Sequence, residues 1–220
     1  MLKHLDINLE GRDFVCGDIH GCFSKLQKEL DAIGFDESKD RLFSVGDLVD
    51  RGPESIDFSD WLRKPWFHAV RGNHEVLAIE AVKNGPNSNE SGLHYINGGV
   101  WLCGLPTVEQ QCIAIEMEEL PLAIEVDTKY GLVGIIHAES PHNNWYIARK
   151  MLSDPSEHTK AVALWARTKI NSGDETEIKG LHKLFVGHTP DNEVRCLGNV
   201  IYTDTGACFK GGKLTILQIN

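Results

Sequence analysis

The sequence predicts an α/β domain in which buried strands alternate with helices. Six short runs rich in β-branched and aromatic residues each pass directly into a polar segment that contains glycine or histidine. The runs begin at Phe14, Leu42, Phe67, Leu132, Leu184 and Val200, and a seventh run, KLTILQI, occupies residues 213–219. Apolar residues at helical spacing lie between several of these runs, and such alternation is typical of α/β proteins.

Four helices are expected between the strands. They are placed over residues 23–33, after Pro53, over residues 75–81 and over residues 107–120. Ser24 with Gln27 and Thr107 with Gln110 each have the spacing of a capping box at a helix start. The turn-rich segment KNGPNSNESG, residues 83–92, is expected to be a mobile loop.

Composition limits the classes of function that are open to the chain. With 220 residues and 41% hydrophobic content, it is expected to form one domain over residues 1–220. A net charge of −10 makes nucleic acid and anionic membranes poor partners, because both bind through lysine and arginine. The six cysteines form no CxxC pair and the chain begins with a polar segment, so a reduced, cytoplasmic protein is expected.

Residues of types that bind metal ions follow five of the predicted strands. In open α/β sheets, ligands bind at the loops beyond the carboxyl ends of strands. The residues at these loops are Asp18 and His20, then Asp47, then Asn73 beside His74, then His137, and finally His188. The coincidence of five such loops is the strongest functional signal in the sequence.

Each of these motifs has a simpler explanation when it is taken alone. GDIHG could be a turn with an aspartate cap, and GDLVDRG could be a turn closed by a salt bridge. GNHE could begin a helix with Asn73 as its cap, and His137 or His188 could be a buried, hydrogen-bonded histidine. All five explanations would have to hold together, which favours a shared metal site.

The donor types indicate which metals are expected. Carboxylates, imidazoles and one amide oxygen, without thiolates, suit Mn, Fe or Zn better than Mg or Ca. Three Asp or Asn residues and three histidines are more than one four-coordinate ion requires. The count therefore fits a two-metal site.

The motifs together resemble a known family. GDIHG, GDLVDRG and GNHE, in this order, resemble the signature of the calcineurin-like metallophosphoesterases of the serine/threonine phosphoprotein phosphatase group. HAE and GHTP resemble the later metal histidines of that group, and the small bacteriophage lambda and bacterial types are the nearest in length and ending. The resemblance implies a two-sheet β-sandwich flanked by helices, in four α/β/β/α layers.

The resemblance also assigns expected roles. The first metal would be held by Asp18, His20 and Asp47, and the second by Asp47, Asn73, His137 and His188. His74 would be the general acid for the leaving oxygen, with Asp50 as its orienting partner. Three arginines would bind the phosphate, namely Arg51, Arg71 and Arg167. For Arg167, a solvent-exposed helix residue is the alternative.

The activity implied is hydrolysis of phosphoserine and phosphothreonine, with breadth toward other phosphorylated residues, by direct attack of a hydroxide that bridges two metal ions. Manganese is the expected metal, with iron or zinc as alternatives, and phosphorylated proteins or peptides are the expected partners. A dinucleoside polyphosphate hydrolase or phosphodiesterase on the same scaffold is the second enzymatic reading. A metal-site protein without catalysis would lack a ligand or the acid, and neither is missing.

Other polar residues are expected to have ordinary structural positions. Glu75 is interpreted as an acid in the first turn of a helix, where the helix dipole favours it. Five tryptophans are expected in the core or in pocket walls. The remaining histidines are expected at the surface, and they are His4, His68, His94, His142, His158 and His182.

Overall fold

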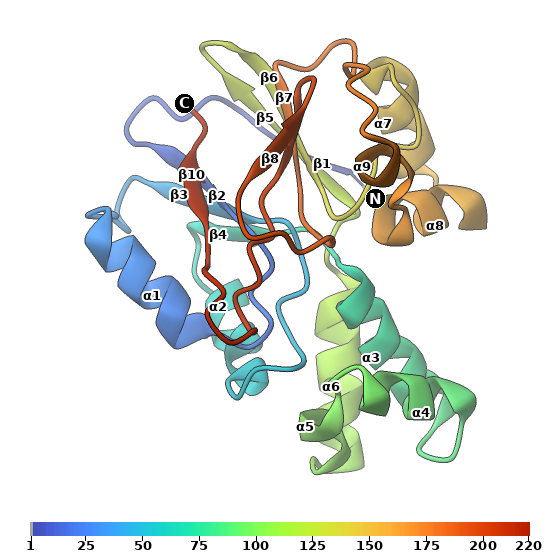
Figure 1. Cartoon of the computed structure of the whole chain (residues 1–220). Helices are drawn as coiled ribbons and strands as arrows, with labels where there is room; N and C mark the ends of the chain where they lie inside the picture. Colours follow the sequence, from blue (N-terminus) through green and yellow to red (C-terminus); the bar gives the residue numbers. More distant parts are fainter. Residues whose placement is uncertain (1) are drawn as a thin grey trace.

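The computed structural model describes residues 2–220, and ten strands in this range form two sheets (Figure 1). The six-stranded sheet has, in order, β1 (Leu2–Leu5), β5 (Ala123–Thr128), β6 (Gly131–Ile136), β7 (Lys183–Val186), β9 (Val200–Tyr202) and β8 (Arg195–Leu197). The four-stranded sheet has, in order, β10 (Ile216–Gln218), β2 (Asp13–Cys16), β3 (Arg41–Ser44) and β4 (Phe67–Ala69).

The parallel strands place several loops at one end of each sheet. In the four-stranded sheet, β2, β3 and β4 are parallel, with β10 antiparallel at the edge beside β2. In the six-stranded sheet, β6, β7 and β9 are parallel. The carboxyl ends of each parallel set therefore lie together, which is the arrangement that collects ligand-binding loops.

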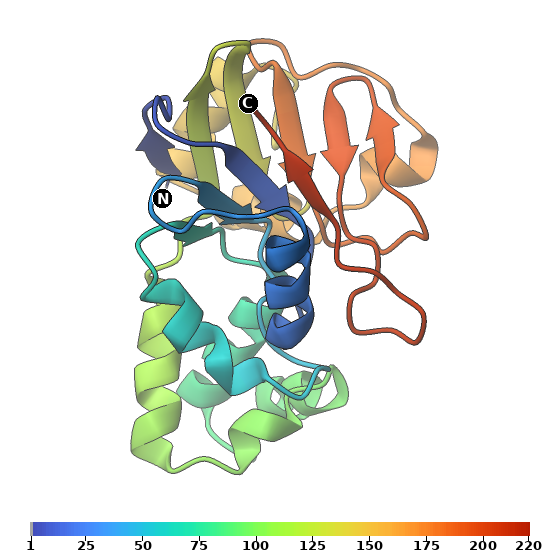
Figure 2. The same ribbon diagram turned by 90° about the vertical axis from the view of Figure 1, so that its left-hand side faces the viewer.

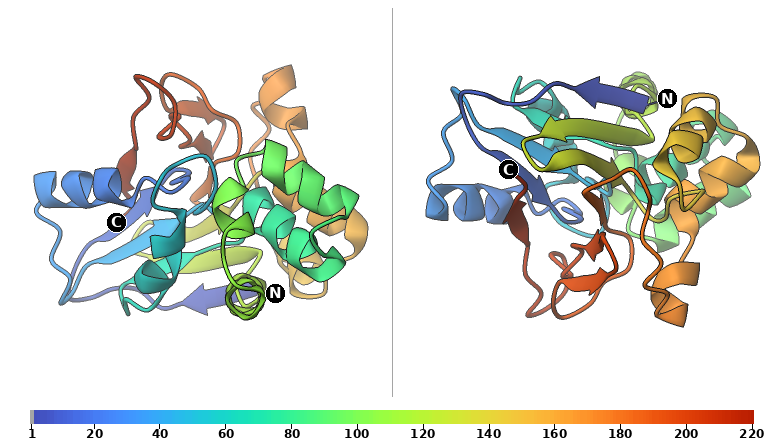
Figure 3. Two further views of the ribbon diagram at one scale, coloured as in Figure 1. Left: turned by 90° about the horizontal axis from the view of Figure 1, so that it is seen from below. Right: turned by 90° about the horizontal axis from the view of Figure 1, so that it is seen from above.

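Helices cover the outer face of each sheet (Figures 1 and 3). On the side of the four-stranded sheet lie α1 (Phe23–Ala32), the short 3-10 helix η1 (Ser55–Asp57) and α2 (Phe58–Leu62). On the side of the six-stranded sheet lie α7 (Trp145–Ser153), α8 (Glu157–Trp165) and α9 (Thr168–Ser172). This arrangement confirms the expected four layers.

Four further helices form a group that extends beyond the ends of the sheets (Figures 1 and 2). They are α3 (Asn73–Asn84), α4 (Asn89–Ile96), α5 (Val100–Cys103) and α6 (Thr107–Glu118). Helix α3 packs against both α4 and α6. Since α3 begins at Asn73, this group is attached directly to one of the predicted metal-binding loops.

Successive side chains along a strand point to opposite faces of the sheet and pack into two different hydrophobic cores, one between the two sheets and one between a sheet and its helices. Val15 and Phe43 of the four-stranded sheet meet Val133, Ile135 and Phe185 of the six-stranded sheet in one buried cluster. The next residues along the strands, such as Phe14 and Leu42, point the other way and pack with the helices. This period of two is expected when both faces of a strand are buried.

The predicted strands are confirmed, each beginning within one residue of its expected start, except that the final strand is shorter than the run KLTILQI. Three strands were not predicted, and they are β1, β5 and β8. The predicted capping boxes are wrong. The N-cap of α1 is Cys22 and that of α6 is Pro106, and neither has a side-chain cap.

Segment 83–92 is only partly a loop. Helix α3 continues to Asn84, and α4 begins at Asn89 with Ser88 as its N-cap, whose side chain accepts from the N–H of Ser91. All six cysteines are free. Among residues 2–220, none of the helices combines the length and apolar character that a membrane crossing requires.

Candidate active site

The predicted metal-binding residues come together where the loops of the two sheets meet. Asp18 and His20 follow β2, Asp47 follows β3, and Asn73 begins α3 after β4. From the six-stranded sheet, His137 follows β6 and His188 follows β7. None of these six side chains belongs to a residue that is more than 5% exposed. Such complete burial of polar groups requires partners that compensate the lost hydration.

The backbone at this site is strained. Among residues 2–220, five residues other than glycine have positive φ, and all five belong to the predicted site: His20, Asp47, Asp50, Arg51 and His188. Their φ values lie between 46° and 72°. A left-handed conformation at a residue with a side chain costs about 1–3 kcal/mol and is concentrated at functional sites. The strain therefore marks the same residues as the motifs do.

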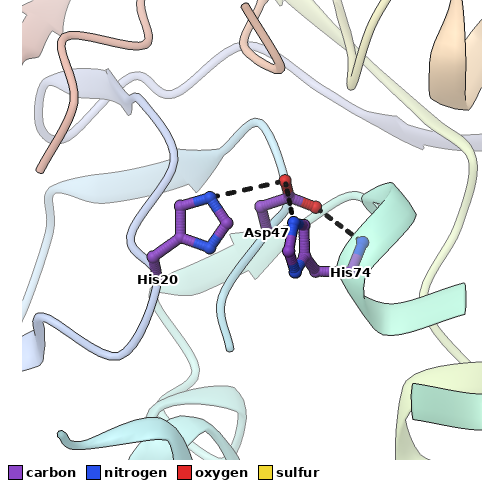
Figure 4. A group of neighbouring side chains, drawn as sticks. All are labelled: His20, Asp47 and His74. Atoms are coloured by element: carbon purple, nitrogen blue, oxygen red, sulfur yellow. Dashed lines mark hydrogen bonds and ion pairs between the residues drawn. The ribbon is translucent and has the colours of Figure 1, made fainter. Parts of the chain in front are cut away.

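Asp47 lies at the centre of the group (Figure 4). Its Oδ2 atom is 3.6 Å from Nε2 of His20 and 4.0 Å from Nε2 of His74, while its Oδ1 atom is 3.4 Å from Nε2 of His137. Two clusters with metal-ligand geometry share this residue, one with His20 and His74 and the other with His137 and His188. Asp47 is thus placed where a bridging ligand would be.

The amide oxygen of Asn73 completes the second cluster. This atom, Oδ1, is 2.8 Å from Nε2 of His137 and also 2.8 Å from Nδ1 of His188. The main-chain N–H of His188 points toward the carboxylate of Asp18, at 3.1 and 3.2 Å from its oxygens. Residues from both sheets therefore converge on a single small volume.

The histidines present unprotonated nitrogens to that volume. The outer ring nitrogen of each faces a main-chain carbonyl: His20 faces Val49 at 2.9 Å, His137 faces Val45 at 2.8 Å, and His188 faces Trp165 at 3.2 Å. A carbonyl only accepts, so the ring proton belongs on the outer nitrogen. The inner nitrogens are then acceptors that face the oxygens of Asp47 and Asn73. Converging acceptors of this kind need a cation between them, which fits a metal site.

The charge states of these groups agree with that arrangement. Burial lowers the pKa of His20 to about 4 and that of His188 to about 3, so both rings are neutral at pH 7. Burial and the neighbouring carboxylates of Asp204 and Asp47 raise the pKa of Asp18 well above its usual value. Divalent metals bind to neutral imidazoles and to carboxylates, and a bound cation would also relieve the repulsion between neighbouring carboxylates.

Two glycines make room for the carboxylates. A Cβ atom added at Gly187 would lie 1.9 Å from Oδ1 of Asp18, and one added at Gly72 would lie 2.2 Å from Oδ1 of Asp47. Both glycines stand next to a candidate ligand, in GNHE and in VGHTP. These motifs therefore require glycine because a carboxylate occupies the space of a side chain.

His74, which belongs to the first cluster, forms a buried pair with Asp50. Nδ1 of His74 donates to Oδ2 of Asp50 at 2.7 Å, so the opposite nitrogen, Nε2, faces Asp47. Burial alone would lower the pKa of His74, but the charge of Asp47 and the hydrogen bond to Asp50 outweigh burial and raise it. A histidine with a raised pKa and a fixed orientation is suited to donate a proton.

Two of the three predicted arginines border the clusters. An Nη atom of Arg51 lies 2.8 Å from Nε2 of His20. The guanidinium of Arg167 donates to Oγ1 of Thr189 at 3.2 Å and to the carbonyl of His188 at 3.1 Å. Both residues are exposed, as a substrate-facing group must be.

Arg71 is placed differently. Its guanidinium donates to the main-chain carbonyls of Glu118 and Leu120 at the end of α6. It also lines a cavity of about 460 Å³ together with Trp165 of α8. Its hydrogen-bond partners are not candidate metal ligands, whereas Arg51 and Arg167 each contact one. Phosphate binding stays a prediction for all three arginines.

Glu75 was interpreted too simply. It is fully buried, and its carboxylate accepts the main-chain N–H groups of Asp47, Leu48 and Gly72 at 2.7–3.0 Å. Glu75 therefore fixes the strained turn that carries Asp47, in addition to capping α3. A glutamate in the first turn of a helix gives no sequence signal for such contacts with another loop.

The surface position expected for His94 is wrong. His94 is buried in α4, and its Nε2 atom lies 2.9 Å from Oδ1 of Asp50. Nε1 of Trp101 donates to the same oxygen at 2.8 Å. Sequence reasoning missed both residues, because His94 is 44 residues from Asp50 and no local motif connects them.

Asp204 is a further buried carboxylate that the sequence reasoning did not select. It follows β9, lies beside Asp18 and is 4% exposed. Burial and the charge of Asp47 raise its pKa to about 6. The signal that could have identified it was its position after a predicted strand, in VIYTDTG.

Comparison with known proteins assigns the family. The sequence profile described as calcineurin-like phosphoesterase matches residues 14–210. The chain belongs to this family. Calcineurin-like phosphoesterases are hydrolases with a dinuclear divalent metal site, and the two clusters that share Asp47 agree with that property.

Individual members of the family show the range of similarity. The serine/threonine-protein phosphatase 1 of Salmonella typhimurium is 38% identical over 209 residues, which cover 94% of this chain and 91% of that protein. The symmetrical bis(5'-nucleosyl)-tetraphosphatase of Coxiella burnetii is 42% identical over 77 residues, only 34% of this chain and 26% of that protein. The crystal structure of a putative diadenosine tetraphosphatase has a TM-score of 0.65 at 22% identity, covering 99% of this chain and 97% of that one, and shows the shared fold.

The glycine that contacts Asp18 provides a test of the metal site. We expect Gly187→Ala to displace the Asp18 carboxylate and to weaken Mn²⁺ binding by roughly 10-fold or more, measured by isothermal titration calorimetry. Gly92→Ala is the matched control, because a Cβ at Gly92 meets open space. Unchanged Mn²⁺ affinity in folded Gly187→Ala protein would contradict the placement of Asp18 at the metal.

Proposed function

We propose that this protein is a metal-dependent phosphoprotein phosphatase that hydrolyses phosphoserine and phosphothreonine in proteins or peptides. The observation that carries the proposal is the buried His74–Asp50 pair, in which His74 faces Asp47, the residue shared by the two metal-ligand clusters. A proton donor at this position serves a substrate whose leaving group is a poor one, such as a serine or threonine alkoxide. The full-length similarity to a serine/threonine-protein phosphatase supports the same substrate class.

The metal ligands are proposed in two sets that share Asp47. Asp18, His20 and Asp47 would hold one ion; His20 and Asp47 lie in one geometric cluster, and Asp18 reaches the site through its contact with the N–H of His188. Asp47, Asn73, His137 and His188 would hold the other. When bound, such a pair of divalent ions activates water for in-line attack and polarises the phosphoryl oxygens. The mixed donor set of carboxylates, imidazoles and an amide favours Mn²⁺, with Fe or Zn as alternatives.

The arginines at the rim would bind the substrate phosphate. Arg51 and Arg167 are exposed and border the clusters, Arg51 beside His20 and Arg167, at the start of α9, beside His188. Each guanidinium can form bidentate hydrogen bonds with phosphate oxygens and can stabilise the negative charge that develops on them. Arg71 would join them only after exchanging its present carbonyl partners for the phosphate.

The His74–Asp50 pair would protonate the leaving oxygen. Asp50 accepts from Nδ1 of His74, which leaves Nε2 as the nitrogen that faces the reaction. The charge of Asp47 and the hydrogen bond to Asp50 outweigh burial and raise the pKa of His74, whereas burial lowers the pKa of His20, His137 and His188, so His74 holds its proton to a higher pH than they do. A phenolate departs more easily than an alkoxide, so a phosphotyrosine or nitrophenyl substrate depends on His74 less.

This difference predicts the behaviour of His74→Asn. We expect the variant to keep its metal content and to lose about 100-fold or more in kcat on a phosphoserine peptide, because general acid catalysis is removed. The loss on nitrophenyl phosphate should be much smaller. Steady-state kinetics on both substrates and metal analysis of the purified protein provide the comparison, and equal losses on the two substrates would refute the general-acid role.

The shared position of Asp47 predicts a different result for Asp47→Asn. Because Asp47 belongs to both clusters, we expect the variant to lose metal and activity together. It should also lose most of the rise in melting temperature that Mn²⁺ gives the wild-type protein, because only a bound ion stabilises the fold. Full metal occupancy in an inactive Asp47→Asn protein would argue against a bridging role.

A dinucleoside polyphosphate hydrolase is the second candidate function. The observation in its favour is the local identity to a symmetrical bis(5'-nucleosyl)-tetraphosphatase. That similarity covers a third of the chain, whereas the similarity to the serine/threonine-protein phosphatase covers nearly all of it.

One assay separates the two functions. We expect the Mn²⁺-loaded protein to turn over a phosphoserine peptide at least 10-fold faster, in kcat/KM, than diadenosine tetraphosphate. The chelated protein is the control and should act on neither substrate. A preference for the dinucleotide would replace the proposed function with the alternative.

A further inference from the structure

The segment from α4 to α5, residues 89–103, contacts the Asp50–Arg51 turn at three points. His94 and Trp101 both contact Oδ1 of Asp50, at 2.9 and 2.8 Å. The carbonyl of Gly98 accepts the main-chain N–H of Arg51 at 3.3 Å. We call this segment the α4–α5 clasp, because it holds the side chain of one residue and the backbone of the next.

The contact surface between the clasp and the turn is tightly packed. A Cβ atom added at Gly98 would lie 2.5 Å from the main-chain nitrogen of Arg51. A Cβ atom added at Gly99 would lie 2.3–2.4 Å from three atoms of the His94 ring. The two adjacent glycines therefore allow the chain to pass close to Arg51 and to the imidazole at once. No bulkier residue fits at either position without moving His94 or the turn.

The turn held by the clasp is under backbone strain. Asp50 and Arg51 have positive φ values of 72° and 68°. With His188, at 69°, they have the three largest φ values among the non-glycine residues of positive φ in residues 2–220. Such strain persists only where surrounding contacts over-determine the conformation. The hydrogen bond from Arg51 to Gly98 and the one from the N–H of Asp50 to Oγ of Ser55, at 2.9 Å, are contacts of that kind.

Both oxygens of the Asp50 carboxylate are hydrogen-bonded to side chains. Oδ2 accepts from His74, while Oδ1 is held by His94 and Trp101. The indole N–H of Trp101 is only a donor, so Oδ1 must accept. Asp50 is fully buried, so its hydrogen bonds to these side chains replace contact with solvent. The direction in which Asp50 presents Oδ2 to His74 is therefore fixed by the two residues on the far side of its carboxylate.

We propose that His94 is a positioning residue for proton transfer, acting through Asp50 to orient His74, with Trp101 as its helper. The inference rests on the proposed function of His74 as the general acid. His94 contacts neither the substrate site nor the metal ligands in its described hydrogen bonds, and its effect passes through a single carboxylate. Loss of the His94 contact leaves Oδ1 of Asp50 held by Trp101 alone, so the carboxylate is less firmly fixed and the alignment of His74 is weakened.

A positioning role and a merely structural role predict different kinetics. If His94 only stabilised the fold, its removal would lower activity on all substrates by the same factor. If His94 orients the general acid, its removal lowers activity on substrates with poor leaving groups more than on substrates with good ones. The readout is therefore the ratio of kcat/KM for p-nitrophenyl phosphate to kcat/KM for glycerol 2-phosphate.

The central test is a double-mutant cycle on the metal-loaded protein. We expect His94→Phe, which keeps a ring but removes the hydrogen bond, to raise the aryl-to-alkyl ratio by about 10-fold. In the His74→Asn background, the same substitution should leave the ratio unchanged, because residues that act as a unit are not additive. An equal shift in both backgrounds, or no shift in the wild-type background, would overturn the proposal.

Three more variants provide controls. His94→Gln retains an N–H donor and should restore part of the wild-type ratio. Tyr95→Phe changes an exposed neighbour in the same helix and should leave the ratio unaltered. Trp101→Phe removes the other donor to Oδ1 and should shift the ratio in the same direction as His94→Phe, so it replaces that variant if His94→Phe does not fold. A wild-type ratio in folded Trp101→Phe would then count against the clasp.

The small substrates keep this test separate from the test of the proposed function. If the wild-type protein did not act on a phosphoserine peptide but His94→Phe still shifted the monoester ratio, the substrate class would be wrong and the role of His94 would stand. If the peptide were cleaved and the ratio did not move, the role of His94 would be wrong and the proposed function would stand.

Discussion

The site depends on one buried carboxylate held in a strained position. Asp47 has a φ of 49°, its N–H is bound by Glu75, and its Oδ1 accepts the N–H of His74. Two loops and a helix start are thereby joined, and the side chain is left between His20 and His137. Gly72 is required because the Asp47 carboxylate occupies the space of its Cβ. A change at any of these contacts would move the group that both metal-ligand clusters share.

Much of the fold and of the site could be predicted because its signals are local. A run of apolar residues that ends in a residue of a metal-binding type predicts a strand followed by a functional loop, and His137 and His188 were selected in this way. Strand β5 was missed because Glu125 interrupts its apolar run. That glutamate is tolerated in the core because Trp145 and Arg149, both from a distant helix, donate to it at 2.8 and 2.6 Å. The partner of the first turn of α1 was missed for a similar reason. It is Glu54, from another loop, which accepts the N–H of Ser24 at 2.7 Å.

The residues that support the proposed catalytic pair and the Asp47 turn are also distant in sequence from the groups they contact. His94, Trp101 and Glu75 each contact a loop that is far away in sequence, and single-sequence patterns carry no information on such pairs. Their positions as a helix residue, a core-type tryptophan and a first-turn acid are all ordinary. The motifs in the strand-end loops therefore identify the candidate metal-binding and substrate-binding groups, whereas the residues that contact and orient these groups come from the helices between the strands.

The division of ligands between two sheets has a consequence for the stability of the whole sandwich. Asp18, His20, Asp47 and Asn73 extend from the four-stranded sheet, and His137 and His188 extend from the six-stranded sheet. Ions bound between these sets would cross-link the two sheets at one end, joining residues that are up to 170 positions apart, as Asp18 and His188 are. Because the unfolded chain does not bring these ligands together, the free energy of ion binding adds to the free energy of unfolding. Ions at the proposed catalytic centre would then also stabilise the contact between the two sheets.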